Sequence, residues 1–91
     1  MGIGLDNIDV TAATERDIVV TNVPDYCVHE VADHTLALLL ACVRNVGYFQ
    51  HEIRGGRYSL AGAPPMHRLS GRVLGLVGFG RIAREVFHRA R

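Results

Sequence analysis

The hydrophobic residues of the chain are arranged in two kinds of pattern. The first consists of short apolar runs, which are typical of strands. Residues 18–23 and 73–77 are short, mostly aliphatic and β-branched runs, and Asp17, Pro24 and glycines bound them. Pro24 ends the first run because proline has no N–H to donate to a sheet. The sequence therefore predicts two strands of a parallel sheet, separated by about 50 residues.

Longer stretches have helical character. Residues 27–45 predict the longest helix, with acidic residues near its start and Arg44 near its end, as the helix dipole favours. Its middle, residues 36–43, is apolar on every face, so we expect this helix to be buried all round. Shorter helices are predicted at 9–16, with Asp9 or Thr11 as cap, and at 48–54, with Gly47 breaking the chain before it. Residues 57–68 contain Pro64 and Pro65 and predict a loop.

The most informative element follows the second predicted strand, where residues 78–83 have the spacing G-x-G-x-x-A and lead into an amphipathic stretch. Strand, glycine turn and helix together are typical of a dinucleotide-binding turn. Gly78 permits the tight turn, Gly80 leaves room for a diphosphate, and Ala83 lets the helix lie close to its strand. Arg81 and Ile82 offer amides at the helix start, and Arg81 also offers a guanidinium. The alternative is a tight turn without a ligand.

Composition excludes several classes of function. The chain has 91 residues, room for at most one small domain, and ten basic residues against nine acidic ones give a net charge of +1. Neither nucleic acid nor a membrane is therefore expected as a partner. The longest apolar run, 36–43, is too short to span a bilayer, and no signal peptide precedes it, so we expect a cytoplasmic protein.

The cysteines and histidines do not predict a disulfide or a metal site. Cys27 and Cys42 form no disulfide framework, and Cys42 is expected to be an inert core thiol. His29 and His34 are five residues apart, so their side chains leave a helix on diverging faces and do not suit zinc. We expect His34 to be a hydrogen-bonded helix histidine at an interface between domains.

Four blocks of sequence extend the pattern over nearly the whole chain: residues 2–9, 18–24, 31–38, and 69–71 leading into the glycine turn. In their order and spacing they resemble the D-isomer-specific 2-hydroxyacid dehydrogenases. The stretch from Val23 to Cys27 looks most like the branch of phosphoglycerate dehydrogenases and C-terminal-binding proteins. The resemblance implies an α/β fold with two doubly wound, Rossmann-like domains, of which this chain is an internal fragment that is helix-rich in isolation.

The resemblance also assigns parts of the chain to those domains. Residues 1–23 would be the tail of the substrate-binding domain, and residues 24–91 would be the N-terminal part of the NAD-binding domain. The long helix would line the domain interface, residues 46–70 would form a dimerisation arm, and residues 73–91 would be the first strand–turn–helix unit. The intact protein is therefore expected to be a homodimer.

Further site residues follow from the resemblance. Ile3 and Gly4 match a loop whose amides hold the substrate carboxylate, with a plain turn as the alternative. Val31 matches a position near the nicotinamide, with helix core as the alternative. Tyr26 and Cys27 match positions close to that of Val31, and the alternative for both is that they pack in the hinge. The family's catalytic arginine, carboxylate and histidine have no match here, so we assign no catalytic residue and expect this chain alone to be inactive.

These expectations together predict an oxidoreductase that uses NAD, with NADP not excluded. Its substrate would be a D-2-hydroxy acid or the corresponding 2-oxo acid. The alternative is a corepressor or scaffold of the same fold that senses a dinucleotide without turnover.

Overall fold

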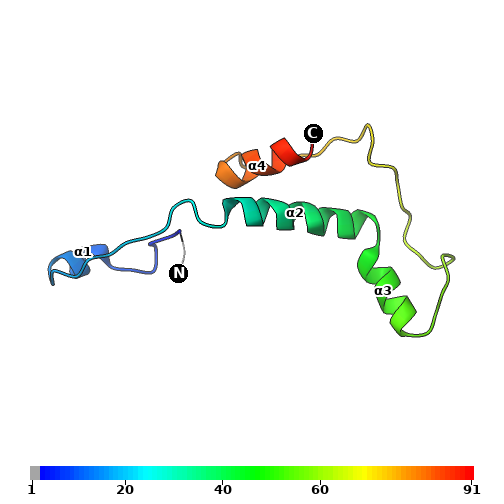
Figure 1. Cartoon of the computed structure of the whole chain (residues 1–91), viewed down its shortest axis with the longest axis horizontal. Helices are drawn as coiled ribbons and strands as arrows, with labels where there is room; N and C mark the ends of the chain where they lie inside the picture. The colour runs from blue at the N-terminus through cyan, green and yellow to red at the C-terminus, as the bar shows by residue number, and fades with distance from the viewer. Residues whose placement is uncertain (1–2) are drawn as a thin grey trace.

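A computed structural model describes residues 3–91 as an elongated, mainly helical chain (Figure 1). Four helices follow one another: α1 (Val10–Thr14), α2 (Val28–Val43), α3 (Val46–Arg54) and α4 (Arg81–Arg89). The chain measures 65 × 34 × 17 Å, and its radius of gyration of 20.4 Å exceeds the value of about 12 Å typical of a compact domain of this length. Met1 and Gly2, where the first family-like block starts, lie outside the described residues.

The predicted helices are present, with shifted boundaries. Asp9 caps α1 as predicted, because its Oδ1 accepts a hydrogen bond from the Ala12 amide at 2.9 Å. The prediction that Gly47 breaks the chain between α2 and α3 is wrong, since Gly47 lies inside α3. The break falls at Asn45, which adopts a left-handed conformation (φ 54°) that asparagine tolerates well. The Asn45 side chain also donates a hydrogen bond to the Pro64 carbonyl at 2.7 Å.

The tertiary packing of the chain is concentrated between α2 and α4, which lie side by side in Figure 1. The buried apolar side chains among the described residues are Val28 and Ala32 of α2 and Val86 of α4. The expectation that α2 is buried all round is therefore wrong: α4 covers one face, while residues such as Leu38 and Leu40 remain exposed. Cys42 is likewise exposed and is not a core thiol.

The two predicted strands are not formed within residues 3–91. Residues 18–23 and 73–77 run without regular secondary structure and leave side chains such as Val19 and Val73 exposed. A strand exists only as part of a hydrogen-bonded ladder, and neither segment lies against a second one. The described part of the chain is thus helix-rich, as the resemblance implies. Within it, no helix combines the length and apolar character that crossing a membrane requires.

Candidate functional site

The glycine turn at residues 78–80 has a backbone geometry that explains its residue types. Gly78 has φ 82°, a conformation that side chains with a Cβ rarely adopt. Gly80 is extended (φ −79°, ψ −165°) and precedes α4, and its carbonyl accepts the first hydrogen bond of the helix from the Arg84 amide at 3.1 Å. Within the described chain, a Cβ built on either glycine would meet no atom within 4 Å. Both glycines therefore leave open space above the turn.

The turn presents the start of α4. In the described residues no side chain caps this helix, so its first amides, those of Arg81, Ile82 and Ala83, have no partner from a capping side chain. Phe79, between the two glycines, packs its ring edge-on against Phe87 with 6.1 Å between centroids. The phenyl ring thereby packs the turn against α4.

A cavity of about 430 Å³ opens at this turn. The predicted cofactor-binding residues Gly78, Gly80, Arg81, Ile82 and Ala83 all line it. Ile3, predicted to bind substrate from the opposite end of the sequence, lines the same cavity. The structure thus brings together six of the eight predicted site residues.

Gly4 and Val31 are not among the residues that line this cavity. Gly4 is exposed next to Ile3, whose carbonyl accepts a hydrogen bond from Asn22 Nδ2 at 2.8 Å. Val31 lies on α2, and its carbonyl accepts a hydrogen bond from the Thr35 hydroxyl at 2.7 Å. Tyr26 and Cys27 also lie outside the cavity wall.

Sequence reasoning missed several residues of the wall: Val28, Thr35, Leu76, Val77 and Val86. The spacing of Val28, Ala32 and Thr35 at i, i+4 and i+7 places them on one face of α2, and this was the signal that could have found them. That face meets α4, so the wall of the cavity is continuous with the small buried core.

An ion pair that sequence reasoning also missed joins Arg81, the first residue of α4, to Asp25 in the segment before α2. Arg81 Nη1 donates to Asp25 Oδ1. The two residues are 56 positions apart in sequence. No local spacing rule connects them.

At the other end of α4, Arg89 lies in a second group of charges. Its Nε donates to Asp33 Oδ1 and its Nη1 to Glu85 Oε2, both at 2.5 Å. The hydrogen bond from Arg89 lowers the pKa of Glu85 and raises that of Arg89; desolvation opposes the effect on Glu85. His29 Nδ1 lies 3.3 Å from Glu85 Oε2. These contacts fix the register of α4 along α2.

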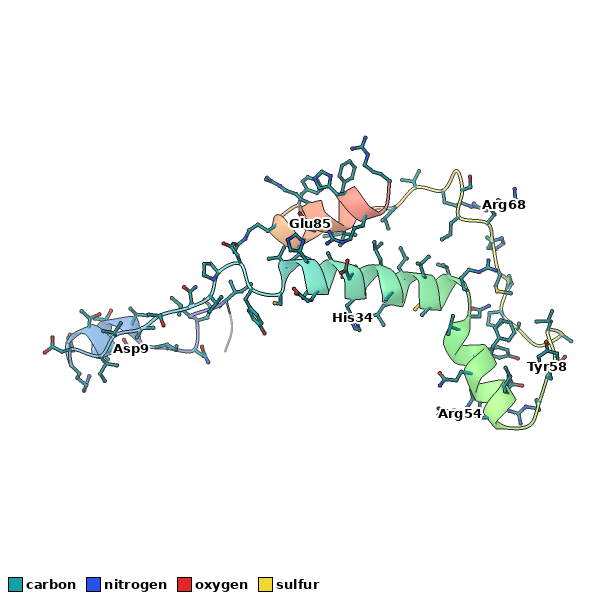
Figure 2. All side chains as sticks on the ribbon, in the orientation of Figure 1. Asp9, His34, Arg54, Tyr58, Arg68 and Glu85 are labelled. Carbon is teal, nitrogen blue, oxygen red and sulfur yellow. The ribbon has the colours of Figure 1, made fainter. Side chains whose placement is uncertain are left out.

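His34 does not take part in this interface. It is exposed, and Figure 2 shows it directed away from α4. The expected hydrogen bond of His34 at the interface between the two domains stays a prediction, since the face of α2 that meets α4 is a different one, set by Val28 and Ala32.

Comparison with known proteins gives a family match over almost the whole chain. The family model described as "D-isomer specific 2-hydroxyacid dehydrogenase, catalytic domain" matches residues 1–89. No solved structure is a significant match.

Several curated relatives are similar over nearly all of the chain. A glyoxylate reductase from Pyrococcus furiosus is 43% identical over 98% of this chain and 28% of its own length. A D-3-phosphoglycerate dehydrogenase from Methanocaldococcus jannaschii is 40% identical over 99% of the chain and 17% of its own length. A hydroxypyruvate reductase from Thermotoga maritima is 42% identical over 98% of the chain and 29% of its own length. The chain thus spans less than a third of the length of these relatives.

Proposed function

Since this chain belongs to the D-isomer-specific 2-hydroxyacid dehydrogenase family, we propose that its protein is an oxidoreductase acting on a D-2-hydroxy acid or the corresponding 2-oxo acid. The relatives named above are reductases and dehydrogenases by name, which supports this reaction class. They do not favour the corepressor alternative.

The glycine turn fits a dinucleotide diphosphate. Gly78 and Gly80 leave open space above the turn, and the amides of Arg81 and Ile82 begin a helix that no described side chain caps. The open space at Gly78 and Gly80, next to the uncapped start of α4, is the observation that carries the proposal. NAD, or NADP, would supply the hydride, while the chain's part is to bind and orient the diphosphate.

The substrate-facing part of the proposal rests on Ile3. It lines the same cavity as the glycine turn, so a ligand at Ile3 and a nucleotide at Gly80 would be neighbours. Asn22 holds the Ile3 carbonyl, which fixes the loop at the cavity wall. We propose that the amides of Ile3 and Gly4 bind the carboxylate of the acid. Val31, which does not line this cavity, would lie closer to the nicotinamide than to the diphosphate.

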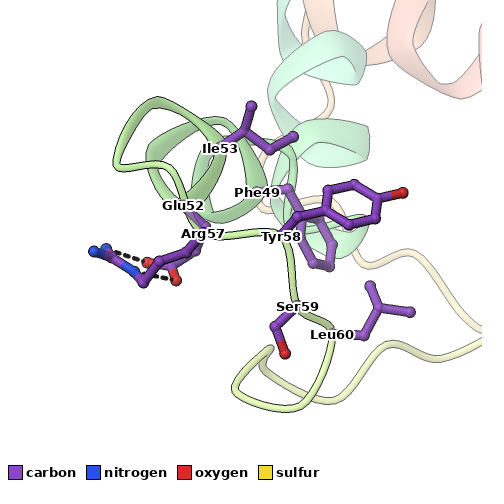
Figure 3. Close-up of a pocket in the computed structure, with 7 residues that line it drawn as sticks. All are labelled: Phe49, Glu52, Ile53, Arg57, Tyr58, Ser59 and Leu60. Carbon is purple, nitrogen blue, oxygen red and sulfur yellow. Dashed lines mark hydrogen bonds and ion pairs between the residues drawn. The ribbon is translucent and has the colours of Figure 1, made fainter.

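We also propose that the protein is a homodimer through the arm at residues 46–70. The arm presents apolar side chains around a cavity of about 520 Å³, lined by Phe49, Glu52, Ile53, Arg57, Tyr58, Ser59 and Leu60 (Figure 3). Tyr58 is 95% exposed and Leu60 is 77% exposed. Exposed apolar residues that gather in one place are typical of an interface.

Both cysteines are free thiols, in keeping with the proposed cytoplasmic location.

The test of the nucleotide site is Gly80→Val, followed by titration of NAD in a calorimeter. The φ of Gly80 suits any residue, so the turn can keep its backbone conformation, while the new side chain would occupy the space needed by the diphosphate. We expect NAD affinity to fall by about tenfold or more.

Gly75→Val is the matched control for this experiment. A Cβ added at Gly75 would likewise meet no described atom within 4 Å, but Gly75 does not line the cavity. The control should bind NAD as the unchanged protein does. Equal affinities of the Gly80→Val variant and the unchanged protein would overturn the assignment of the turn, and a protein without affinity for NAD or NADP would overturn the proposed cofactor.

A further inference from the structure

Arg81 stands between two cavities. Arg81 lines the cavity at the glycine turn, and it also lines a second cavity of about 330 Å³ on the neighbouring side of α4. The second cavity is lined by Asp25, Val28, His29, Arg81, Arg84, Glu85 and His88. A guanidinium in this position can serve either cavity by rotation of its side chain.

Asp25 takes up the Arg81 guanidinium on the side of the second cavity. The carboxylate belongs to the segment that follows Pro24 and leads into α2, and it reaches the first residue of α4. The side chain of Asp25 is 81% exposed and that of Arg81 is 54% exposed. An ion pair this exposed is weak and exchanges readily.

A phosphate at the glycine turn would compete with Asp25 for the same group. Arginine binds carboxylate and phosphate oxygens by the same paired donors, so a contact with one withdraws donors from the other. A carboxylate close to a bound diphosphate would also repel it. Asp25 therefore opposes nucleotide binding for as long as it holds Arg81.

We propose that Asp25 is a positioning residue that occupies the Arg81 guanidinium in the ligand-free protein and yields it to the dinucleotide diphosphate. The inference rests on the proposed function, because it needs a diphosphate at the turn. It adds that binding breaks a contact between the segment before α2 and the start of α4. Asp25 thus lowers the affinity for the cofactor, and it links cofactor binding to the segment through which the chain enters α2.

The experiment is a double-mutant cycle on NAD affinity, measured by calorimetry with Asp25→Asn, Arg81→Ala and the double variant. Asp25→Asn should bind NAD about two- to fivefold more tightly, the range expected when an exposed ion pair is removed as a competitor. Arg81→Ala should bind more weakly. In the Arg81→Ala background, Asp25→Asn should change the affinity far less, because there is no guanidinium to release.

Asp17→Asn is the matched control, since it removes the same charge from an exposed residue whose left-handed backbone asparagine accepts. It should leave the affinity unchanged. Unchanged or weaker binding by Asp25→Asn, while the unchanged protein binds NAD, would overturn the role of Asp25 alone. If Asp25→Asn raised the NAD affinity equally with and without Arg81, the role of Asp25 would also be overturned, because the gain would then come from the charge of Asp25 alone. Absence of NAD binding in every variant would instead overturn the proposed function, and this inference with it.

Discussion

The α2–α4 pair and the arm at residues 46–70 differ in the sequence separation of the residues that hold them together. Between α2 and α4, side chains more than 50 positions apart meet: Asp25 with Arg81, and Asp33 with Arg89. Both pairs have the same separation of 56, so α4 runs parallel to the chain from Asp25 through α2 in a single register. Small apolar residues fill the space between them.

The contacts of the arm instead join residues between 5 and 19 positions apart. Glu52 accepts two hydrogen bonds of 2.8 Å from Arg57, five residues later. Asn45 reaches Pro64, and the position of Gly62 leaves room for the Tyr48 hydroxyl, which would lie 2.9 Å from a Cβ at Gly62. The apolar side chains of the arm face outward. The comparison teaches that α2 and α4 bury Val28, Ala32 and Val86 against each other, whereas the arm leaves apolar side chains such as Tyr58 and Leu60 exposed.

The largest effect on stability is expected from Ala32→Leu. Ala32 is 0% exposed, at the contact of α2 with α4, and the added side chain would force the helices apart. Overpacking of this kind costs about 1–3 kcal/mol of unfolding free energy, which urea denaturation measures. Ala37→Leu is the control, because Ala37 lies exposed on the same helix. A cost shared by both variants would mean that α2 and α4 do not pack as described.

A smaller effect is expected from acid. The pKa of Glu85 is lowered by its hydrogen bond from Arg89, so this pair stabilises the folded state above the ordinary pKa of 4.5 and ceases to do so as the pH falls through the lowered value. Stability measured by urea should therefore decrease between about pH 5 and pH 3. Arg89→Met should reduce that decrease.

The arm supplies the control for this prediction. Arg57 lowers the pKa of Glu52 in the same way, but the pair lies away from α4. Arg57→Met should leave the acid dependence of the α2–α4 contact unchanged. That contact can be followed by the fluorescence of a tryptophan introduced at Phe87, which lies on α4. An equal response to both substitutions would contradict the separation between the two regions.

Local features of the fold could be predicted from the sequence. The long helix, the Asp9 cap and the helix after the glycine turn follow from residue preferences within a few positions, and the structure has them close to the predicted boundaries. The cradle at Gly78 and Gly80 was predicted by the same kind of reasoning. The meeting of Ile3 with the glycine turn was only implied by the resemblance to a family, because no local rule joins residues this far apart.

Features that depend on a distant partner were predicted poorly. The apolar run 36–43 indicates a buried helix, but burial requires a covering surface, and α4 covers only the face of Val28 and Ala32. The same reason applies to the predicted strands, since β-branched residues favour a ladder but do not supply its second strand. The pairing of Asp25 with Arg81 had no signal at all in the spacing of the residues.

The smallest effect on stability, and the sharpest test of the comparison, is expected in the arm. Replacing Tyr58 and Leu60 together by serine removes side chains that are 95% and 77% exposed, so the unfolding free energy of the monomer should change by no more than about 0.5 kcal/mol. If the arm is the dimer interface, the same change should raise the dissociation constant of the dimer by about tenfold or more, measured by sedimentation. Val19→Ser removes an equally exposed apolar side chain outside the arm and should leave the dimer intact. An unchanged protein that sediments as a monomer, or a dimer that the double variant does not weaken, would show that the exposed apolar residues of the arm do not mark the interface.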